Sequence, residues 1–439
     1  MQKLLKMGLF STFLAGMAFA NSAMAESLTI ATVNNGDMVV MQKLSSQFTA
    51  ETGIDLSWVV LEENVLNQRV TTDVATGSGQ FDVVTIGAYT TPIWGRLGWL
   101  TELNDLGPDY DTDDVLPTVK TALSVDGKMY ASPFYAESSF TFYRKNLFEK
   151  AGLTMPEQPT YAQIAEFAAK VNDKANGVYG ICLRGKAGVG ENVSYLGAVI
   201  NTFGGRWFDE SWKPELNSEP WKKAVGFYVD LLQKYGPPGA SSNGFNENLA
   251  LFSTGHCAMW IDATVAAGML FDPKKSSVSK DVGYVQSPLQ DHAEGARSFW
   301  SWGLGIPASS KKVELAKRFI VWATSKDYIK RVAASEGWVA IPPGTRFSTY
   351  KLPEYLAAAP FAEPTLKAIL SVDTTEPNYR PVPYIGAHYV VIPEFQAIGS
   401  TLGQMIAGAL TGGSTVDEAL DQAQSSTERM MQQAGYYNN

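Results

Sequence analysis

The sequence predicts an α/β protein with two lobes, each built on a doubly wound sheet. Early in the chain, short apolar segments with strand character alternate with amphipathic helical segments, the pattern of a sheet whose strands are joined by covering helices. A second α/β unit follows later. The 439 residues, even without a 25-residue leader, exceed what a single hydrophobic core usually organises. Two lobes are therefore expected.

The chain begins with the pattern of a secretory signal peptide. A basic start precedes an apolar stretch over residues 7–20, and a small-x-small site ends at Ala25. Such an apolar stretch is too short for a permanent membrane anchor. We expect cleavage after Ala25. The new N-terminus, Glu26, is not a cysteine that could carry a lipid, so the sequence predicts a freely diffusing periplasmic protein.

Composition and charge narrow the possible partners. Hydrophobic residues make up 45% and aromatic residues 12% of the chain, enough to bury sizeable cores. The formal charge of −9 becomes −11 when the two leader lysines are lost, and no basic cluster remains. Nucleic acid is therefore not an expected partner. Cys182 and Cys257 could pair in an oxidising compartment, or each could be a small buried thiol.

The first α/β unit follows from hydrophobic periodicity. Strands show short apolar or alternating runs, whereas helices place apolar residues three and four positions apart. The expected elements are a strand at 27–33, a turn at 34–36, a helix capped by Asp37 and stopped by Gly53, a strand at 54–60, a helix over 65–74 and a continuously apolar strand at 81–87.

Polar side chains follow the ends of these three strands. They are Asn34 and Asn35, Glu62 and Glu63, and Tyr89. Ligands of doubly wound sheets bind outside the carboxyl ends of the strands, and these side chains suit hydroxyl groups. They could equally serve as turn and cap residues. Their convergence at three strand ends favours a binding role.

A second α/β unit is expected downstream. The sequence predicts a strand at 177–185, an amphipathic helix at 220–235, a buried strand at 257–261 and a helix at 314–323.

Several motifs of nucleotide or metal binding are incomplete. The segment GKAGVG at 185–190 lacks the lysine position and the strand-to-helix context of a phosphate-binding loop, so a plain loop is expected. Aspartates at 109, 111 and 113 resemble the start of a calcium loop, but its sixth position is Asp114 and its twelfth is Lys120. The three histidines, at 256, 292 and 388, are too scattered to suggest a zinc site. No metal and no cofactor are expected.

Enzymatic activity has little support in the sequence. Neither a nucleophile elbow nor a His-Glu-x-x-His motif is present. A carboxylate pair for glycoside hydrolysis depends on a separation in space that 44 acidic residues do not reveal. The sequence predicts a protein that is not an enzyme, with a periplasmic carbohydrate-active enzyme as the competing hypothesis and no catalytic residues assigned.

Successive segments of the chain match one known family. They are FDVVTIGAYTTPIW (81–94), LTELNDL (100–106), GKMYASPFYAESSFTFYRKNLFEKAGL (127–153), NTFGGRWFDE (201–210), FSTGHCAMWIDATV (252–265), SFWSWGLGIP (298–307) and VELAKRFIVWATS (313–325). In this order they resemble the family 1 extracellular solute-binding proteins of carbohydrate importers. No single segment is specific, but their order is, and the resemblance covers essentially the whole mature chain.

The resemblance implies the type II periplasmic binding protein fold, in which two lobes with doubly wound mixed sheets are joined by a hinge and close on a ligand. Mapped onto this chain, it assigns residues 26–134 and 286–338 to lobe one, and 135–285 and 339–439 to lobe two. Segments at 135–139, 299–302 and 379–381 resemble the branch that binds mannitol, sorbitol and related polyols. The implied partners are a small polyol and the permease of an ABC importer, and we expect a monomer. A mono- or oligosaccharide is the alternative ligand.

An uncharged polyol must be held by many hydrogen bonds and by apolar contact with its C–H groups. Carboxylates and guanidinium groups suit vicinal hydroxyls, and aromatic rings offer flat apolar surface. Some candidates have structural alternatives: Trp260 as core, Asp262 as a helix cap, Arg206 in a salt bridge, and the tryptophans at 300 and 302 as core packing. The candidates are Asn35, Glu62, Tyr89, Tyr135, Glu137, Arg206, Trp260, Asp262, Trp300, Trp302 and Arg380.

Overall fold

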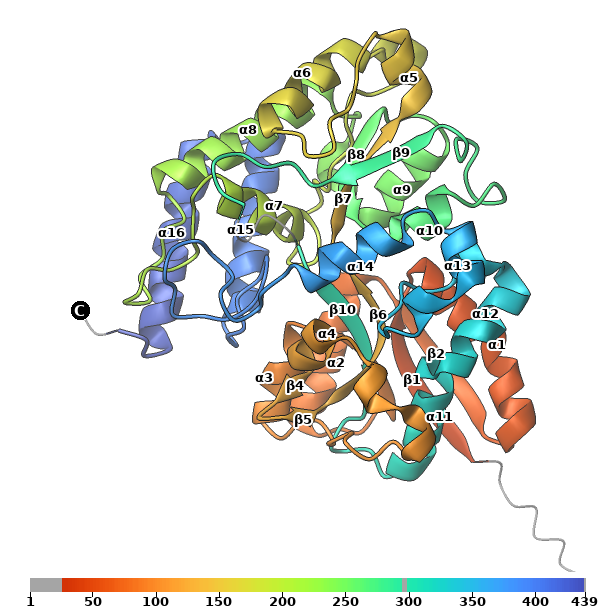
Figure 1. Ribbon diagram of the computed structural model, residues 1–439. Helices are drawn as coiled ribbons and strands as arrows, with labels where there is room; N and C mark the ends of the chain where they lie inside the picture. The colour runs from red at the N-terminus through yellow and green to blue at the C-terminus, as the bar shows by residue number, and fades with distance from the viewer. Residues whose placement is uncertain (1–25, 294–297, 438–439) are drawn as a thin grey trace, which may run out of the picture.

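The computed structural model describes residues 26–293 and 298–437. The predicted signal peptide lies outside the described residues. Two bodies, each with its own sheet, lie one above the other in Figure 1. Across the described ranges, no helix is long and apolar enough to cross a membrane.

The first sheet has five strands in the order β2-β1-β3-β10-β6. β1, β2 and β3 are parallel, and β10 lies antiparallel between β3 and β6. The sheet is therefore mixed, and its fourth strand comes from a segment more than 200 residues downstream of the third. The strands are β1 Ser27–Val33, β2 Asp55–Leu61, β3 Val83–Gly87, β6 Ala131–Glu137 and β10 Trp300–Gly305.

Helices cover this sheet. The connections between the first three strands are the helices that the sequence predicts, and a two-stranded hairpin lies beside them. The elements are α1 Gly36–Thr52, α2 Glu63–Thr76, α3 Thr90–Arg96, α4 Pro117–Ala122, the hairpin strands β4 Ser124–Val125 and β5 Lys128–Met129, α11 Val313–Thr324 and α12 Lys326–Glu336. Short 3-10 helices lie at Pro108–Tyr110, Thr112–Asp114, Lys174–Asn176, Ala240–Ser242, Trp338–Ala340 and Thr349–Lys351.

Two local predictions in this unit were wrong. The N-cap of α1 is Asn35, and Asp37 lies inside the first turn, where a carboxylate is also favoured by the helix dipole. Val65 was expected on the buried face of α2, but 45% of its surface is exposed, because the buried face runs through Leu66, Val70 and Val74 instead.

The second sheet has three strands in the order β8-β7-β9, all antiparallel to their neighbours. Its strands are β7 Ser139–Arg144, β8 Met259–Ala263 and β9 Val282–Gln286. The helices of this body are α5 Lys145–Lys150, α6 Tyr161–Val171, α7 Asn192–Thr202, α8 Glu219–Tyr235, α9 Phe245–Ser253 and α10 Ala266–Leu270.

The strand predicted at 177–185 does not form as a regular strand. The segment follows β8 in parallel through two isolated bridges, Tyr179 to Cys257 and Cys182 to Trp260. Gly180 lies so close to α6 that a Cβ there would be 2.3 Å from the Ala168 carbonyl oxygen, so the backbone bends toward the helix and leaves the ladder.

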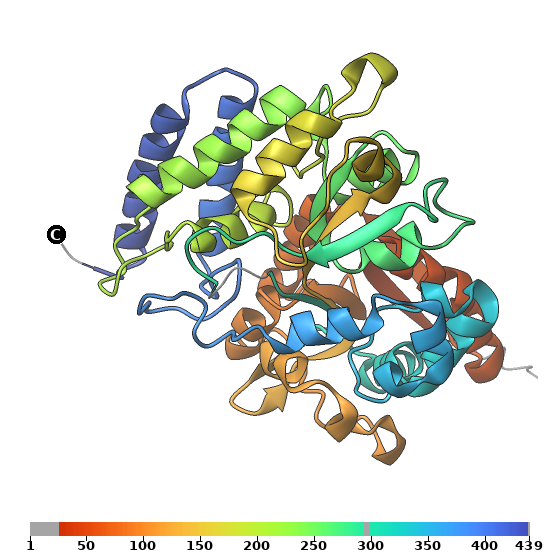
Figure 2. The ribbon, with the colours of Figure 1, turned by 45° about the horizontal axis from the view of Figure 1, so that its top comes forward.

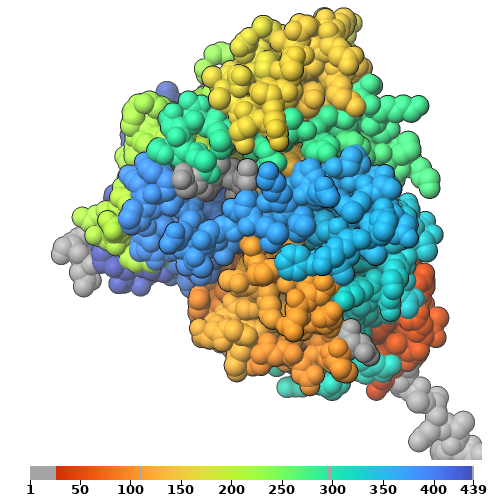
Figure 3. Space-filling view, viewed as in Figure 1, coloured from red at the N-terminus to blue at the C-terminus, as the bar shows by residue number. Residues whose placement is uncertain are grey.

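The chain passes between the two bodies more than once. Ser138 alone separates β6 from β7, and after β9 in the second body the next strand, β10, lies in the first. The third passage includes α13 Pro353–Ala358 and α14 Ala362–Leu370, which contact α4 and β6 of the first body through α14. In Figure 3 this segment forms a bright-blue belt between the upper and lower halves. The predicted lobe boundaries stay a prediction.

The chain ends in the second body. α15 Phe395–Leu410 and α16 Val416–Gln433 contact each other and α8, and α15 also contacts α7. Figure 2 shows these helices grouped at the edge of the molecule, away from α12. This helical group supports α7, which contributes to the cavity described below.

Candidate ligand-binding site

A cavity lies where the two sheets meet. The C-terminal end of β6, the first residue of β7, the C-terminal part of β8 and the start of β10 all reach it. The space between its atoms is about 830 Å³, including the part that opens to solvent. Its lining residues are Asn35, Glu63, Tyr135, Glu137, Ser139, Tyr161, Arg184, Gly190, Ser194, Tyr195, Ala198, Phe245, Ile261, Asp262, Ala263, Val265, Ser287, Ser298, Trp300, Trp302 and His388.

One wall of the cavity comes from β6 and the N-cap of α1. Asn35 Nδ2 donates a hydrogen bond to the Tyr135 hydroxyl over 3.2 Å. Tyr135 and Glu137 lie two residues apart on β6, so their side chains leave the strand on the same face. Burial, followed by the charge of Glu137, raises the pKa of Tyr135 well above its usual value. This hydroxyl therefore stays protonated and can donate a hydrogen bond.

Two tryptophans of β10 form an aromatic wall. Trp300 and Trp302 also lie on one face of their strand, with ring centroids 5.4 Å apart and an angle of 76° between the planes. Gly87 on β3 makes room for the first ring: a Cβ at position 87 would lie 2.0 Å from Trp300 Cζ2. The indole therefore fills the space that the glycine leaves.

Gly87→Ala is expected to weaken ligand binding by about tenfold or more, because the added methyl group must displace the Trp300 ring and overpacking typically costs about 1–3 kcal/mol. Gly226→Ala is the matched control. Gly226 lies in α8, and a Cβ there meets no atom within 4 Å in the described part of the chain, so affinity should not change. Isothermal titration calorimetry measures the affinity of both variants for a ligand of the cavity. Equal affinities would show that ligand binding does not need the Trp300 ring in this position.

The opposite wall holds a buried ion pair. Arg184 Nε lies 3.0 and 3.1 Å from the two carboxylate oxygens of Asp262, and Arg184 Nη2 lies 2.6 Å from Oδ1. The side chains are only 11% and 3% exposed. Arg184 Nη1 also donates to the Gly190 carbonyl oxygen over 2.5 Å, and the guanidinium lies 5.2 Å from the ring centre of Phe245. These contacts leave the arginine little freedom to turn.

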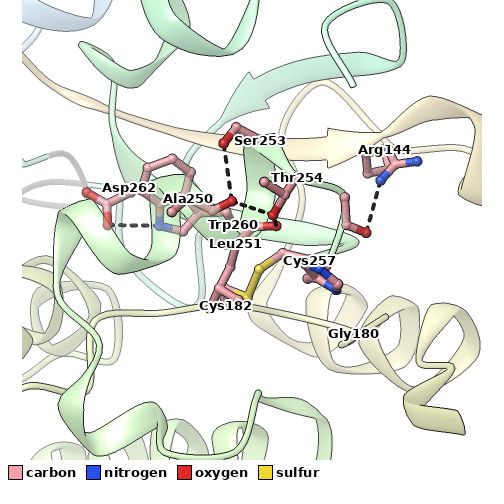
Figure 4. Close-up of a disulfide and its surroundings, with 12 residues drawn as sticks. Arg144, Gly180, Cys182, Ala250, Leu251, Ser253, Thr254, Cys257, Trp260 and Asp262 are labelled. Atoms are coloured by element: carbon pink, nitrogen blue, oxygen red, sulfur yellow. Dashed lines mark hydrogen bonds between the residues drawn. A yellow bond between two sulfur atoms is a disulfide. The ribbon is translucent and has the colours of Figure 1, made fainter. Parts of the chain in front are cut away.

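A disulfide lies behind this ion pair. Cys182 and Cys257 are bonded, with their Cα atoms 5.9 Å apart, which settles the alternative that the sequence left open. Cys182 lies two residues before Arg184, and Cys257 lies two residues before β8. Figure 4 shows the disulfide beside Trp260, whose Nε1 donates to Asp262 Oδ2 over 2.9 Å. The bond thus joins the two segments that carry the ion pair.

Two further carboxyl groups face the cavity without a cation of their own. Within residues 26–293 and 298–437, neither Glu137 nor Glu63 forms an ion pair, and Glu137 Oε2 has no hydrogen-bond partner. Burial raises the pKa of Glu137 to about 8, although the charge of Arg184 opposes the rise. Burial and the charge of Glu191 raise the pKa of Glu63 to about 8. Both groups are therefore mainly protonated at neutral pH.

A serine and a neutral histidine complete the polar lining. Ser194 Oγ lies 3.1 Å from His388 Nε2. Burial, together with the charge of Arg184, lowers the pKa of His388 to about 3. His388 Nδ1 has no hydrogen-bond partner among the described residues, so this pair lacks the third group that orients the histidine of a catalytic triad. The pair is suited to bind hydroxyl groups.

The cavity gathers six of the eleven residues that the sequence predicts. Asn35, Tyr135, Glu137, Asp262, Trp300 and Trp302 all line it.

Two of the other five lie close to the cavity without lining it. Glu62 accepts hydrogen bonds from the backbone N–H groups of Asn64 and Val65 as the cap of α2, and it pairs with Lys186 over 2.6 Å. Trp260 is fully buried in the core, where it donates to Asp262. The structure thus places Glu62 as a helix cap and Trp260 as a core residue, which are the structural alternatives named for these positions.

The remaining three lie away from the cavity. The Tyr89 hydroxyl donates to the Ile392 carbonyl oxygen over 3.1 Å and accepts from the Gln396 N–H over 3.0 Å. Arg206 and Arg380 both pair with Glu215, over 2.8 and 3.0 Å. In each case another protein group already binds the polar end of the side chain, through Nη2 in both arginines.

Several lining residues were missed. Glu63 was noted at the end of a strand but was not selected, and Arg184 lies at the end of the segment that was expected to be a strand; the rule that ligands lie at strand ends would have found both. Tyr161, Ser194, Tyr195 and Phe245 lie on or beside helices of the second body, and His388 follows a long irregular segment. Nothing in the sequence pattern distinguishes these from ordinary core residues.

Comparison with known proteins identifies the class. The model of the bacterial extracellular solute-binding protein family matches residues 34–330, and the chain belongs to this family. Its fold is that of the type II periplasmic binding proteins, as in a maltose-bound MalE3 of Thermotoga maritima with a TM-score of 0.79 over 92% of this chain and 100% of that chain, at 22% identity.

Two relatives are much more similar. The mannitol-binding protein of Pseudomonas aeruginosa is 55% identical over 413 residues, which cover 94% of each chain. An ABC transporter solute-binding protein of Agrobacterium vitis S4, solved with bound D-mannitol, is 59% identical, with a TM-score of 0.93 over 94% of this chain and 100% of that chain. A solute-binding protein of Agrobacterium radiobacter K84 in complex with ribitol is 27% identical, with a TM-score of 0.81 over 92% and 98% of the chains.

Proposed function

We propose that this protein captures a linear sugar alcohol, D-mannitol or a similar hexitol, in the periplasm and delivers it to the permease of an ATP-driven importer. The observation that carries the proposal is the cavity itself. It combines an aromatic wall, Trp300 and Trp302, with an amide, hydroxyl, carboxyl and guanidinium lining. Such a lining can pair many hydroxyl groups at once. The two relatives described as binding mannitol support the same ligand.

The geometry also supports capture by closure of the two lobes. Groups from both bodies meet around the cavity: Lys186 of the second body pairs with Glu62 of the first, and Asn246 Nδ2 donates to the Asn34 carbonyl oxygen over 3.2 Å. A ligand that contacts both bodies would favour this closed arrangement. The permease would then recognise the closed shape. We further propose that the mature protein starts at Glu26 and acts as a monomer.

The ligand can be tested with the mature protein, unfolded and refolded to remove any carried-over ligand. D-mannitol is expected to raise the free energy of unfolding by about 2.7 kcal/mol at 100 times its dissociation constant, because it binds only the folded state. Thermal unfolding against hexitols, pentitols, aldoses and disaccharides measures the effect. A shift with disaccharides or aldoses alone would keep the transport role and change the ligand. Turnover of any sugar would favour an enzyme.

A further inference from the structure

Among the described residues, the cavity holds more carboxyl groups than cations. Apart from its tyrosines, the described ionisable lining consists of Glu63, Glu137, Asp262 and Arg184, together with His388. Asp262 engages the arginine through both carboxylate oxygens, and the histidine is neutral because burial lowers its pKa to about 3. Glu63 and Glu137 therefore remain without a cationic partner among the described residues, and both are mainly protonated at neutral pH. A neutral hexitol gives neither acid a reason to ionise.

Glu137 is the acid placed to contact a ligand. Glu137 is only 8% exposed and lines the cavity. Its Oε2 has no hydrogen-bond partner in the part of the chain that the structure describes. A buried polar atom without a partner is costly, and ligands or ions commonly satisfy such atoms. The group thus has both the position and the unused bonding capacity of a ligand contact.

The neighbouring charges favour a cation at this point. Apart from burial, the groups that act on Glu137 are Arg184, Asp262, Glu63 and Asp37, three acids and one cation. Together with burial they keep its pKa at about 8. A positive charge beside the carboxyl would favour its ionised form, whereas an anion would favour its protonated form. No group of three or more His, Cys, Asp or Glu residues within 26–293 and 298–437 is arranged to hold a metal ion, so an organic cation fits better.

We propose that the same cavity also binds hexitols that carry one protonated primary amine, with the ammonium group on Glu137. This inference rests on the proposed function, since it uses the same cavity and the same polyol chain. On binding, the ammonium donates a hydrogen bond to the Glu137 carboxylate, and the proton that the carboxyl held is released to solvent. The amine keeps its own protons throughout.

Two ligands of equal chain length test the inference: D-mannitol and 1-amino-1-deoxy-D-mannitol, titrated calorimetrically at pH 7. Both are expected to bind. Glu137→Gln should lower the affinity for the amine at least about tenfold relative to the affinity for mannitol. The amide cannot take a negative charge, but it keeps its hydrogen-bonding capacity. Glu102→Gln is the matched control, since Glu102 pairs with Lys128 on the surface and should change neither ligand.

Proton release gives an independent readout. Titrations in two buffers of different ionisation enthalpy should show about one more proton released with the amine than with mannitol at pH 7, because Glu137 changes from acid to carboxylate only with the amine. Glu63→Gln keeps the Glu137 carboxyl and should still release about one more proton with the amine than with mannitol. This variant replaces Glu137→Gln in the test if Glu137→Gln does not fold. Mannitol binding without amine binding, or equal proton release for both, would overturn the inference and leave the proposed function intact. If mannitol itself does not bind, the proposed function fails.

Discussion

Asp262→Ala is expected to abolish ligand binding and to lower the free energy of unfolding by about 3–5 kcal/mol, because it leaves a buried arginine without its counter-charge. The carboxylate accepts from Arg184, from Trp260 Nε1 and from the Ala263 N–H. All three donors lose their acceptor in the variant. The guanidinium, which is one of the polar groups that line the cavity, also loses the contact that fixes its orientation.

Urea unfolding followed by tryptophan fluorescence measures the stability, and calorimetry with D-mannitol measures binding. Glu51→Ala is a matched control, because Glu51 also binds an arginine through both oxygens, Arg331, but this pair is 44% and 31% exposed. Exposed pairs contribute about 0–1 kcal/mol. If both variants lose the same small amount of stability, the buried pair has no special role in this fold.

The first three strands of the first sheet could be predicted because each carries its own local pattern. The apolar run from Val83 to Gly87 is fully buried, and in β1 the exposed first residue is followed by residues that are all buried except the half-buried Thr29. Local sequence patterns do not reveal the order of the strands in the sheet. β10 enters between β3 and β6 only through long-range pairing, such as Trp302 opposite Gly87 and Tyr135.

The site candidates were selected for their chemistry on segments that match the family. Tyr135, Glu137 and Asp262 lie on such segments, near the ends of β6 and β8, and they line the cavity. Arg206 and Arg380 were selected in the same way, but Glu215 binds both. Sequence gives the chemistry of a side chain, but whether another protein group already satisfies it depends on distant residues.

The same distinction applies to the orientation of Arg184. Its segment does not form a regular strand, and its orientation depends on Asp262, 78 positions away. Two long-range constraints hold the segment beside β8: the Cys182 N–H donates to the Met259 carbonyl oxygen over 2.9 Å, and Cys182 is bonded to Cys257. The position of the arginine is therefore a property of the cross-linked pair of segments.

Removing the disulfide is expected to have the second large effect. The double substitution Cys182→Ala/Cys257→Ala should lower the free energy of unfolding by about 4 kcal/mol, since the bond closes a loop with a sequence separation of 75 and so restricts the unfolded chain. Both cysteines are fully buried, so alanine leaves some empty volume but introduces no polar group. Urea unfolding of the variant and of the oxidised parent protein measures the difference.

The position of the disulfide predicts a loss of function beyond this loss of stability. If the bond holds Arg184 against Asp262, the variant should bind D-mannitol more weakly, by about tenfold or more, even at temperatures where it is fully folded. A restriction of the unfolded chain alone would leave the affinity of the folded protein unchanged, because the unfolded state does not take part in ligand binding. Calorimetry well below the unfolding temperature separates the two effects. Unchanged affinity would limit the disulfide to a role in stability, whereas weaker binding would show that the cross-link positions the guanidinium in the cavity.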